Sequence, residues 1–415
     1  MIHTLELSRE ISKDTFEQII STYNMRWDKS SFTTTMFAER GLPMVRLRKE
    51  KKRKEKKTEF DSHGKKYMKI HYMIYLSINP GQMNNGDPHL STPTLLYSPS
   101  FIESMYREII DIIPCLDECP DVFTAWKKEF DLVQGQDIHY EKMVRLKEVW
   151  LEKNAFKAHR IDYCIDIYNF ANEYLELIMQ GYGVRKRQCM RMNVYHKETE
   201  IQERNLPHNP NENYDFLRLE VQADKEKLHN TLYKWEDEKQ DGYSDSQQRE
   251  LQFLITLEIE KYILKEYITE MTGTGIYVSY ELAKEIIDSS PYSEQVREKM
   301  VAVIDAVNEE HGIANVLGMA RKGQTPKLGR ESTVKTYLRY IHKLGINPVT
   351  LSEKSNAPLR VFRDKDGHVV QKKVLFNLLD IVDVYFRRLE EKRNGNFDLT
   401  EADFEAIDKL GPQGE

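Results

Sequence analysis

Apolar residues recur at two different spacings along the chain: before about Gln247, alternation and helical spacing are mixed, and from there helical spacing prevails. Earlier segments alternate, or are rich in β-branched and aromatic residues, as strands do: Lys66 to Asn79, His159 to Tyr168, Gln188 to His196 and Phe216 to Gln222. Helical spacing is found from Ser100, over 169–179 and through most of 247–311. This mixture, joined by long connections, predicts an α+β fold around a mainly antiparallel sheet with flanking helices.

Length and composition narrow the class of protein. A chain of 415 residues, with 40% hydrophobic and 31% charged residues, can form two or three globular domains. It has no apolar run of about 18 residues and no secretory signal at its start, so we expect a cytoplasmic protein without a membrane span. The four cysteines lack zinc-site spacing, which also fits a reducing compartment.

The C-terminal part of the chain differs from the rest in charge. The whole chain has a net charge of −6, yet the segment 321–393 contains 17 Lys and Arg against 8 Asp and Glu. It follows a segment with several glycines, 312–329, which we expect to form a loop and where we place a domain boundary. We therefore predict a first domain over 1–318 and a small, mostly helical, basic domain over 319–415 that contributes affinity for DNA.

Two predicted strands carry polar residues that could perform chemistry. Asp162 and Asp166 are four residues apart in one strand, so they share a face and could hold a divalent cation, which prefers oxygen ligands. In the next strand Arg191, Tyr195 and Lys197 share a face. Tyrosine can act as a covalent nucleophile, and nearby cations can stabilise the negative charge that develops.

A third predicted strand places Arg218 and Glu220 on one face. Each of these patterns alone also fits an ordinary polar strand face. Taken in order along the chain, however, they form a set of five short motifs. These are IYLSINP (74–80), RIDYCID (160–166), YGVR (182–185), VYHK (194–197) and RLE (218–220).

The order and spacing of the five motifs resemble the Rep_trans family of rolling-circle plasmid replication initiators, which also includes some conjugative-element relaxases. The resemblance covers roughly residues 1 to 310. It implies a nicking-joining endonuclease domain in which Tyr195 is the nucleophile, with Lys197 and Arg191 beside it. It also implies a Mg²⁺ or Mn²⁺ ion held by Asp162, with Asp166, His71 or Glu220 as further ligands.

Three positions depart from the family pattern. Ser77 stands where an acidic residue is common, Asn193 stands where the family has arginine, and His196 replaces Asn or Asp. His71 lies on the same strand face as Ser77 and could supply the missing ligand.

Basic residues elsewhere are expected to contact DNA. The segment 46–57 contains nine Lys and Arg against two Glu. The predicted contacts are Arg46, Arg48, Lys51, Lys52, Arg53, Lys54, Arg185, Lys186 and Arg218.

The sequence therefore predicts a rolling-circle initiator that cuts one strand of an origin. The cut would leave a 5′-phosphotyrosine and a free 3′-hydroxyl primer. The resemblance implies a homodimer and a helicase partner. A conjugative relaxase with the same chemistry, and a non-catalytic origin- or operator-binding protein, remain alternatives.

Overall fold

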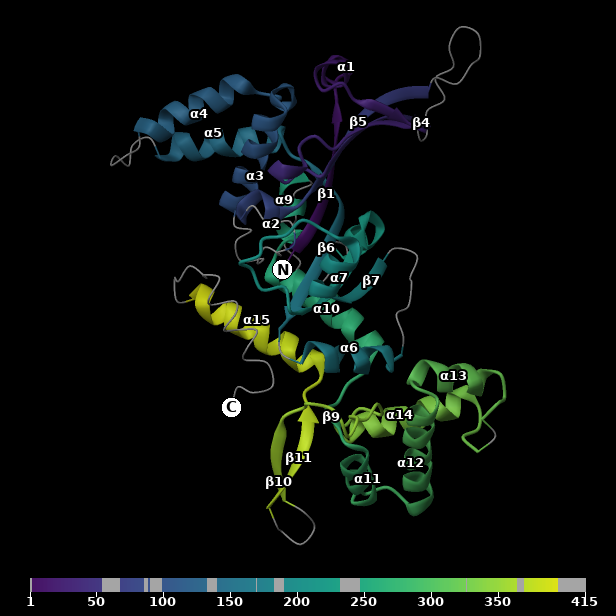
Figure 1. Ribbon diagram of the computed structural model, residues 1–415. Coiled ribbons are helices and arrows are strands. Elements are labelled where there is room, and N and C mark those ends of the chain that lie inside the picture. The colour runs from purple at the N-terminus through teal and green to yellow at the C-terminus, as the bar shows by residue number, and fades with distance from the viewer. Residues whose placement is uncertain are drawn as a thin grey trace. The chain divides into compact units, whose positions relative to one another are not determined.

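The computed structural model describes residues 2–53, 68–85, 89, 99–132, 140–168, 170–182, 190–231, 247–325, 327–363 and 369–394. Its strands form an eight-stranded sheet, in the order β2-β3-β4-β5-β1-β6-β8-β7, and a three-stranded sheet, in the order β10-β11-β9. The predicted α+β class with a large antiparallel sheet is confirmed (Figure 1). The chain divides into two units: unit 1 is Met1–Tyr163 with Gln222–Glu260, and unit 2 is Cys164–Val221 with Lys261–Glu415.

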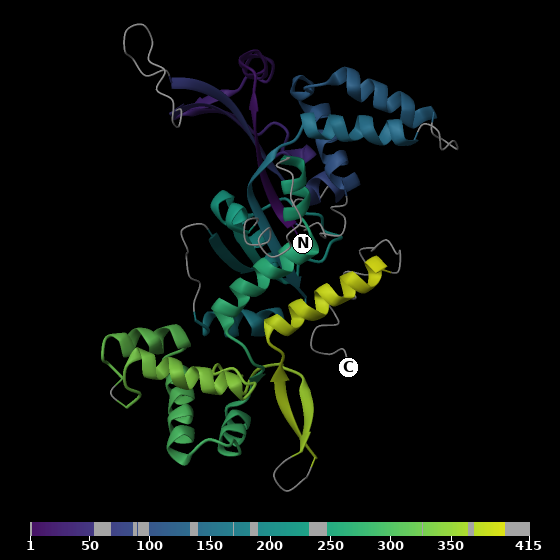
Figure 2. The same cartoon turned by 180° about the vertical axis from the view of Figure 1, so that it is seen from behind.

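Unit 1 is built on antiparallel strands whose two faces differ. Leu7, Leu47 and Leu76 lie on the buried face, whereas Arg46 and Tyr75 pair on the other. Its helices include α4 and α5, which run side by side in both views (Figures 1 and 2). The strands are β1 Ile2–Ile11, β2 Arg26–Asp28, β3 Ser31–Thr34, β4 Met44–Arg53, β5 Met68–Ile78 and the first part of β6 Lys157–Ile167. The helices are α1 Lys13–Thr22, α2 Pro80–Asn85, α3 Pro99–Ile112, α4 Pro120–Leu132, α5 Tyr140–Lys153 and α9 Gln247–Leu254.

Unit 2 contains the end of β6, most of β8 and all of β7, followed by helices and a hairpin. The hairpin strand β11 pairs with the short strand β9, and α14 packs against α12 and α13. The strands are β7 Met190–His196, β8 Leu217–Asp224, β9 Tyr277–Val278, β10 Leu359–Arg363 and β11 Val369–Leu375. The helices are α6 Ala171–Met179, α7 Lys197–Arg204, α10 Leu257–Thr272, α11 Tyr280–Asp288, α12 Glu294–Glu309, α13 Ile313–Arg321, α14 Glu331–Lys343 and α15 Leu378–Asn394.

The sequence-based elements and the observed ones agree best where alternation was strong. β5, β6, β7 and β8 lie within a few residues of the four predicted strands. By contrast, the residues 313–321, which we expected in a loop, form helix α13 despite Gly318. The predicted boundary after residue 318 therefore falls inside a helix.

A membrane-spanning helix needs about 20 consecutive, mostly apolar residues, and the helices of the described residues fall short of this. None of them is both long enough and apolar enough to cross a bilayer.

Candidate active site

The order of strands in unit 2 decides which polar side chains meet. β8 lies between β6 and β7, although it follows both of them in the sequence. Residues at alternate positions share a face of the sheet, so the polar residues of β8 lie between those of its two neighbours. Arg218 can thus reach Asp166 on one side, while Glu220 reaches Tyr195 on the other.

Tyr195 is held by a buried carboxylate. Its hydroxyl donates a hydrogen bond to Glu220 Oε2 over 3.3 Å, and the Asn193 side-chain amide donates to Glu220 Oε1 over 3.0 Å. The Glu220 side chain is 4% exposed, whereas Tyr195 is half-buried. The carboxylate therefore lies at hydrogen-bond distance from the hydroxyl and can accept its proton.

Arg218, two residues before Glu220 on β8, forms a buried ion pair with Asp166 of β6. Arg218 donates from Nε and Nη2 to the two oxygens of Asp166, each over 2.7 Å. The guanidinium is fully buried and lies over the Phe216 ring, with 5.2 Å between the guanidinium carbon and the ring centroid. Such a bidentate pair fixes the position of both side chains.

Lys197 brings a second cation to the cluster. Lys197 is the first residue of α7 and is buried. Its Nζ donates to Glu200 Oε2 over 2.9 Å. Arg204 also pairs with Glu200, over 2.8 Å. Lys197 Nζ lies 5.5 Å from the centroid of the Tyr195 ring. The face thus holds a tyrosine hydroxyl, a carboxylate and two buried cations.

Burial changes the acidity of these groups. It raises the pKa of Tyr195, and Glu220 adds to that rise, while Arg218 opposes it. Burial and Arg218 lower the pKa of Lys197, against the effect of Glu200. Burial would lower the pKa of Arg218, but Asp166 outweighs it and holds that pKa above its usual value. Tyr195 therefore needs a proton acceptor to react at neutral pH, and Lys197 gives up its proton more readily than an exposed lysine.

In unit 1, Asp162 lies in a different arrangement. Arg160 donates from Nε to Asp162 over 2.6 Å and also bonds the other oxygen of that carboxylate. A further nitrogen of Arg160 donates to Glu6 over 2.9 Å. The Asp162 side chain is 1% exposed. Its charge is thus already matched by a guanidinium.

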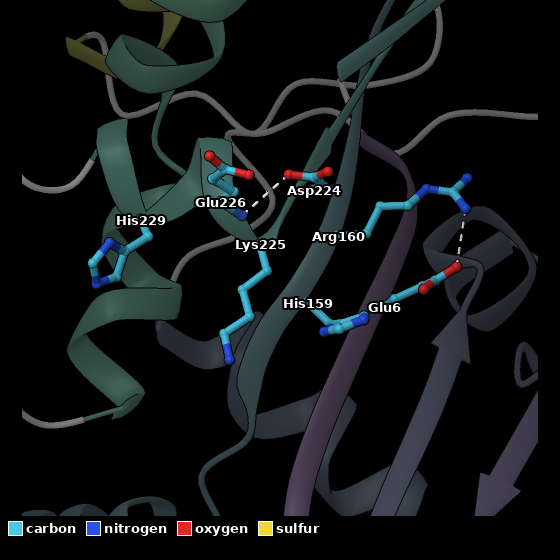
Figure 3. A pocket seen from close by; sticks show the side chains of 7 residues that line it. All are labelled: Glu6, His159, Arg160, Asp224, Lys225, Glu226 and His229. Atoms are coloured by element: carbon cyan, nitrogen blue, oxygen red, sulfur yellow. Dashed lines mark hydrogen bonds and ion pairs between the residues drawn. The ribbon is translucent and has the colours of Figure 1, made fainter. Parts of the chain in front are cut away.

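Arg160 also borders an open hollow of about 600 Å³ in unit 1. Figure 3 shows Arg160 reaching to Glu6 on one side, with His159 nearby and the Asp224 strand end opposite. The lining residues are Glu6, His159, Arg160, Asp224, Lys225, Glu226 and His229. The lining mixes both charges, so it favours no single class of ligand.

Each of the four predicted metal ligands contacts another side chain of its own unit. His71 Nδ1 lies 2.9 Å from Glu10 Oε1, and Asp162 and Asp166 are held by arginines. Within the described ranges, the one set of three side chains close enough to share an ion is His196, Glu198 and Asp215. Glu220 is the one predicted ligand that contacts Tyr195. Asp162 and Asp166 could bind an ion only if they gave up these arginine contacts.

The sequence showed His196 only as a departure from the family pattern, and it gave no sign of Asp215. Their side chains lie 3.1 Å apart, and Glu198 completes the group at the first turn of α7. Because Tyr195 and His196 are consecutive in a strand, their side chains point to opposite faces. The alternation of β7 could have shown this, but nothing in the sequence links Asp215 to it.

The predicted DNA-contacting residues are placed as follows. Arg46 and Arg48 are exposed on β4. Arg191, which was predicted as a catalytic residue beside Tyr195, is exposed on β7. Arg218 is fully buried against Asp166, so it acts on its neighbours and not on an exposed surface. Lys51, Lys52 and Arg53 belong to β4 by backbone, and their side chains lie outside the described set. Lys54, Arg185 and Lys186 lie outside the described residues altogether.

Comparisons with protein-family models, with curated proteins and with solved structures return no match to this chain.

Proposed function

We propose that the chain is a DNA nicking-joining endonuclease in which Tyr195 is the nucleophile. One observation carries the proposal: the Tyr195 hydroxyl donates to the buried carboxylate of Glu220, beside the cations of Lys197 and Arg218. A tyrosine hydroxyl has a pKa near 10, which makes it a weak nucleophile at neutral pH. A fixed proton acceptor and neighbouring positive charge are what covalent catalysis by tyrosine requires.

The reaction can be written with these residues. Tyr195 Oη attacks the scissile phosphorus, and its proton passes to Glu220. The bond between phosphorus and the 3′-oxygen breaks, which leaves a 5′-phosphotyrosine. The leaving 3′-oxygen takes a proton from Lys197 and becomes the free 3′-hydroxyl. Reversal of the same steps would rejoin the strand.

Positioning falls to the neighbours of the reacting groups. Asn193 fixes one oxygen of Glu220 and leaves the other for Tyr195. Burial raises the pKa of Tyr195, and Arg218, locked by Asp166, opposes that rise, so it favours the ionised hydroxyl without touching DNA. In this account Asn193 and Arg218 are positioning residues.

A divalent cation, Mg²⁺ or Mn²⁺, stays a prediction of the resemblance. When bound, it would supply positive charge to the scissile phosphate. Asp162 and Asp166 are neutralised by arginines, and only Glu220 of the predicted ligands contacts Tyr195. The steps above therefore involve only residues of the chain.

Unit 1 offers support for a nucleic-acid substrate. Arg46 and Arg48 are exposed on the polar face of β4. On that face Tyr75, paired with Arg46, contacts the His159 ring edge-on, with centroids 5.3 Å apart. Exposed arginines on a sheet face suit a phosphate backbone. Replication at a plasmid origin, a helicase partner and a homodimer belong to the proposal through the resemblance alone, and so does the alternative of a relaxase.

A non-catalytic origin- or operator-binding protein is the second candidate. It is favoured by the arginine partners of Asp162 and Asp166, which occupy the two carboxylates expected to hold the cation. Such a protein would bind DNA but would not cleave it.

The test uses the full chain with a supercoiled plasmid that carries DNA from around its gene, with Mg²⁺ present. The proposal expects nicked circles and a protein-DNA adduct that withstands detergent. Tyr195→Phe should give neither product, while Tyr140→Phe, at an exposed tyrosine of α5, should give both. Plasmid binding without any nick or adduct would favour the second candidate.

A further inference from the structure

Helices α13 and α14 of unit 2 carry an unusual charge. The segment 313–345 contains seven Lys and Arg against one acidic residue, Glu331. All seven basic side chains are exposed: Arg321, Lys322, Lys327, Arg330, Lys335, Arg339 and Lys343. The neighbouring segment 280–310, which holds α11 and α12, has eight acidic residues against three basic ones. The positive charge is therefore concentrated on one helix pair.

The single acidic residue balances only two of these cations. Glu331 pairs with Arg321 over 2.9 Å and with Lys335 over 2.8 Å, and these contacts lower its pKa to about 2. Within the described part of the chain, the other five basic residues make no ion pair. Their charge is available to an anionic partner.

The exposed face of α14 presents its donors in a line. Val334, Leu338 and Ile341 pack inward, which turns the opposite side outward. That side carries the α14 stripe, spaced three to four residues apart: Ser332, Lys335, Arg339 and Lys343. Every member can donate a hydrogen bond. The stripe follows one side of a helix of 13 residues, about 20 Å long.

We infer that the α14 stripe docks on duplex DNA, with α14 in the major groove and the cations of the α13–α14 connection on the flanking phosphates. The major groove of B-form DNA, about 12 Å wide, admits an α-helix. The second helix of a helix-turn-helix pair enters the groove in this way. The connection 322–330 is longer than the turn of a helix-turn-helix pair. The positive charge and the exposure of the α14 stripe therefore point to the groove, and not a turn motif.

Duplex DNA fits the stripe better than a single strand does. Single strands are bound through aromatic side chains on which bases stack. The tyrosines of α14 are half-buried and engaged: Tyr340 stacks on Tyr292, with centroids 5.1 Å apart, and Tyr337 lies against Tyr340. The stripe itself has donors and no aromatic ring. Double-stranded RNA is excluded as well, because its major groove is too narrow for side chains to read.

The test measures binding without cleavage, so it does not depend on Tyr195. The full chain, in excess EDTA, is titrated into a labelled 30-base-pair duplex of arbitrary sequence at several salt concentrations. Lys335→Gln/Arg339→Gln/Lys343→Gln should weaken binding by at least about tenfold. It should also make the slope of log K against log salt shallower by about 2 to 3, since each phosphate contact contributes roughly 0.9.

The control removes the same charge elsewhere. Lys127→Gln/Lys128→Gln/Arg145→Gln alters exposed residues of α4 and α5 and should leave binding within about twofold. Thermal melting of both variants checks that they are folded. If both variants lost the same affinity for the duplex, the loss would reflect the change in net charge alone, and the inference would be overturned. A stripe variant with parental affinity and slope would overturn it too, as would stripe-dependent binding of a single strand in preference to the duplex.

Discussion

Two neighbouring residues at the end of β7, Tyr195 and His196, face different surroundings. Tyr195 contacts Glu220, which is 4% exposed, within a network of buried charges. His196 faces the exposed carboxylates of Glu198 and Asp215. Burial strengthens electrostatic interactions and shifts pKa values, which proton transfer can use. The exposed group could bind an ion but perturbs none of the groups needed for a covalent step.

The comparison predicts that chemistry depends on the buried side of β7. Tyr195→Phe should lower the rate of nicking by about 10⁴-fold or more, because the nucleophile itself is lost. DNA affinity should stay within a few fold, since only a hydroxyl is removed. Rates are measured by nicked-circle formation and affinity by fluorescence anisotropy. A variant that still forms the adduct would place the nucleophile at another residue.

Glu220→Gln tests the proton acceptor. The amide keeps the shape of the side chain but cannot take a proton, so nicking should slow by about 10²–10⁴-fold. Asn193→Ala removes only the contact that orients Glu220, and we expect a loss of about tenfold or less. Single-turnover rates separate the two. Equal effects from both variants would argue that Glu220 serves only to position Tyr195.

The buried ion pair should matter for stability. Arg218→Met leaves the Asp166 carboxylate buried without its partner, which should cost about 3–5 kcal/mol in the free energy of unfolding. Replacing both residues, as Arg218→Met/Asp166→Leu, should cost clearly less, because no charge is then left unpaired. Urea denaturation measures both. A double variant no more stable than the single one would contradict this view of the pair.

The exposed side of β7 should give the smallest effect on catalysis. His196→Ala/Asp215→Asn should abolish any Mn²⁺ binding at this group and leave the nicking rate within about twofold. Manganese binding is followed by electron paramagnetic resonance. A large loss of nicking in the variant would indicate that the exposed group, and not the buried side of β7, takes part in the reaction.

The sequence predicts those features of the fold and the site that depend on residues close together in the chain. Alternation gave β5, β6, β7 and β8, and it placed Tyr195 with Lys197 and Arg218 with Glu220 on shared faces. It could not show that β8 inserts between β6 and β7. That insertion places Arg218 beside Asp166 and Glu220 beside Tyr195. Two predicted metal ligands, Asp166 and Glu220, and one predicted DNA contact, Arg218, therefore lie in a buried network.

Helices were harder to predict where local signals conflicted with packing. Gly318 and the nearby glycines suggested a loop, yet α13 forms because Ile313, Val316 and Leu317 bury one side of it. A Cβ added at Gly318 would meet open space, so the structure does not require a glycine at this position.

The most direct test of the central claim is to identify the residue that carries DNA after cleavage. The adduct is trapped on a nick-site oligonucleotide, digested with nuclease and trypsin, and analysed by mass spectrometry. Cleavage after Arg191 and Lys197 releases the peptide 192–197, in which Tyr195 is the only tyrosine. The account predicts a nucleotide attached to Tyr195 through its 5′-phosphate. A nucleotide on any other peptide, or no covalent adduct under conditions that give nicking, would contradict it.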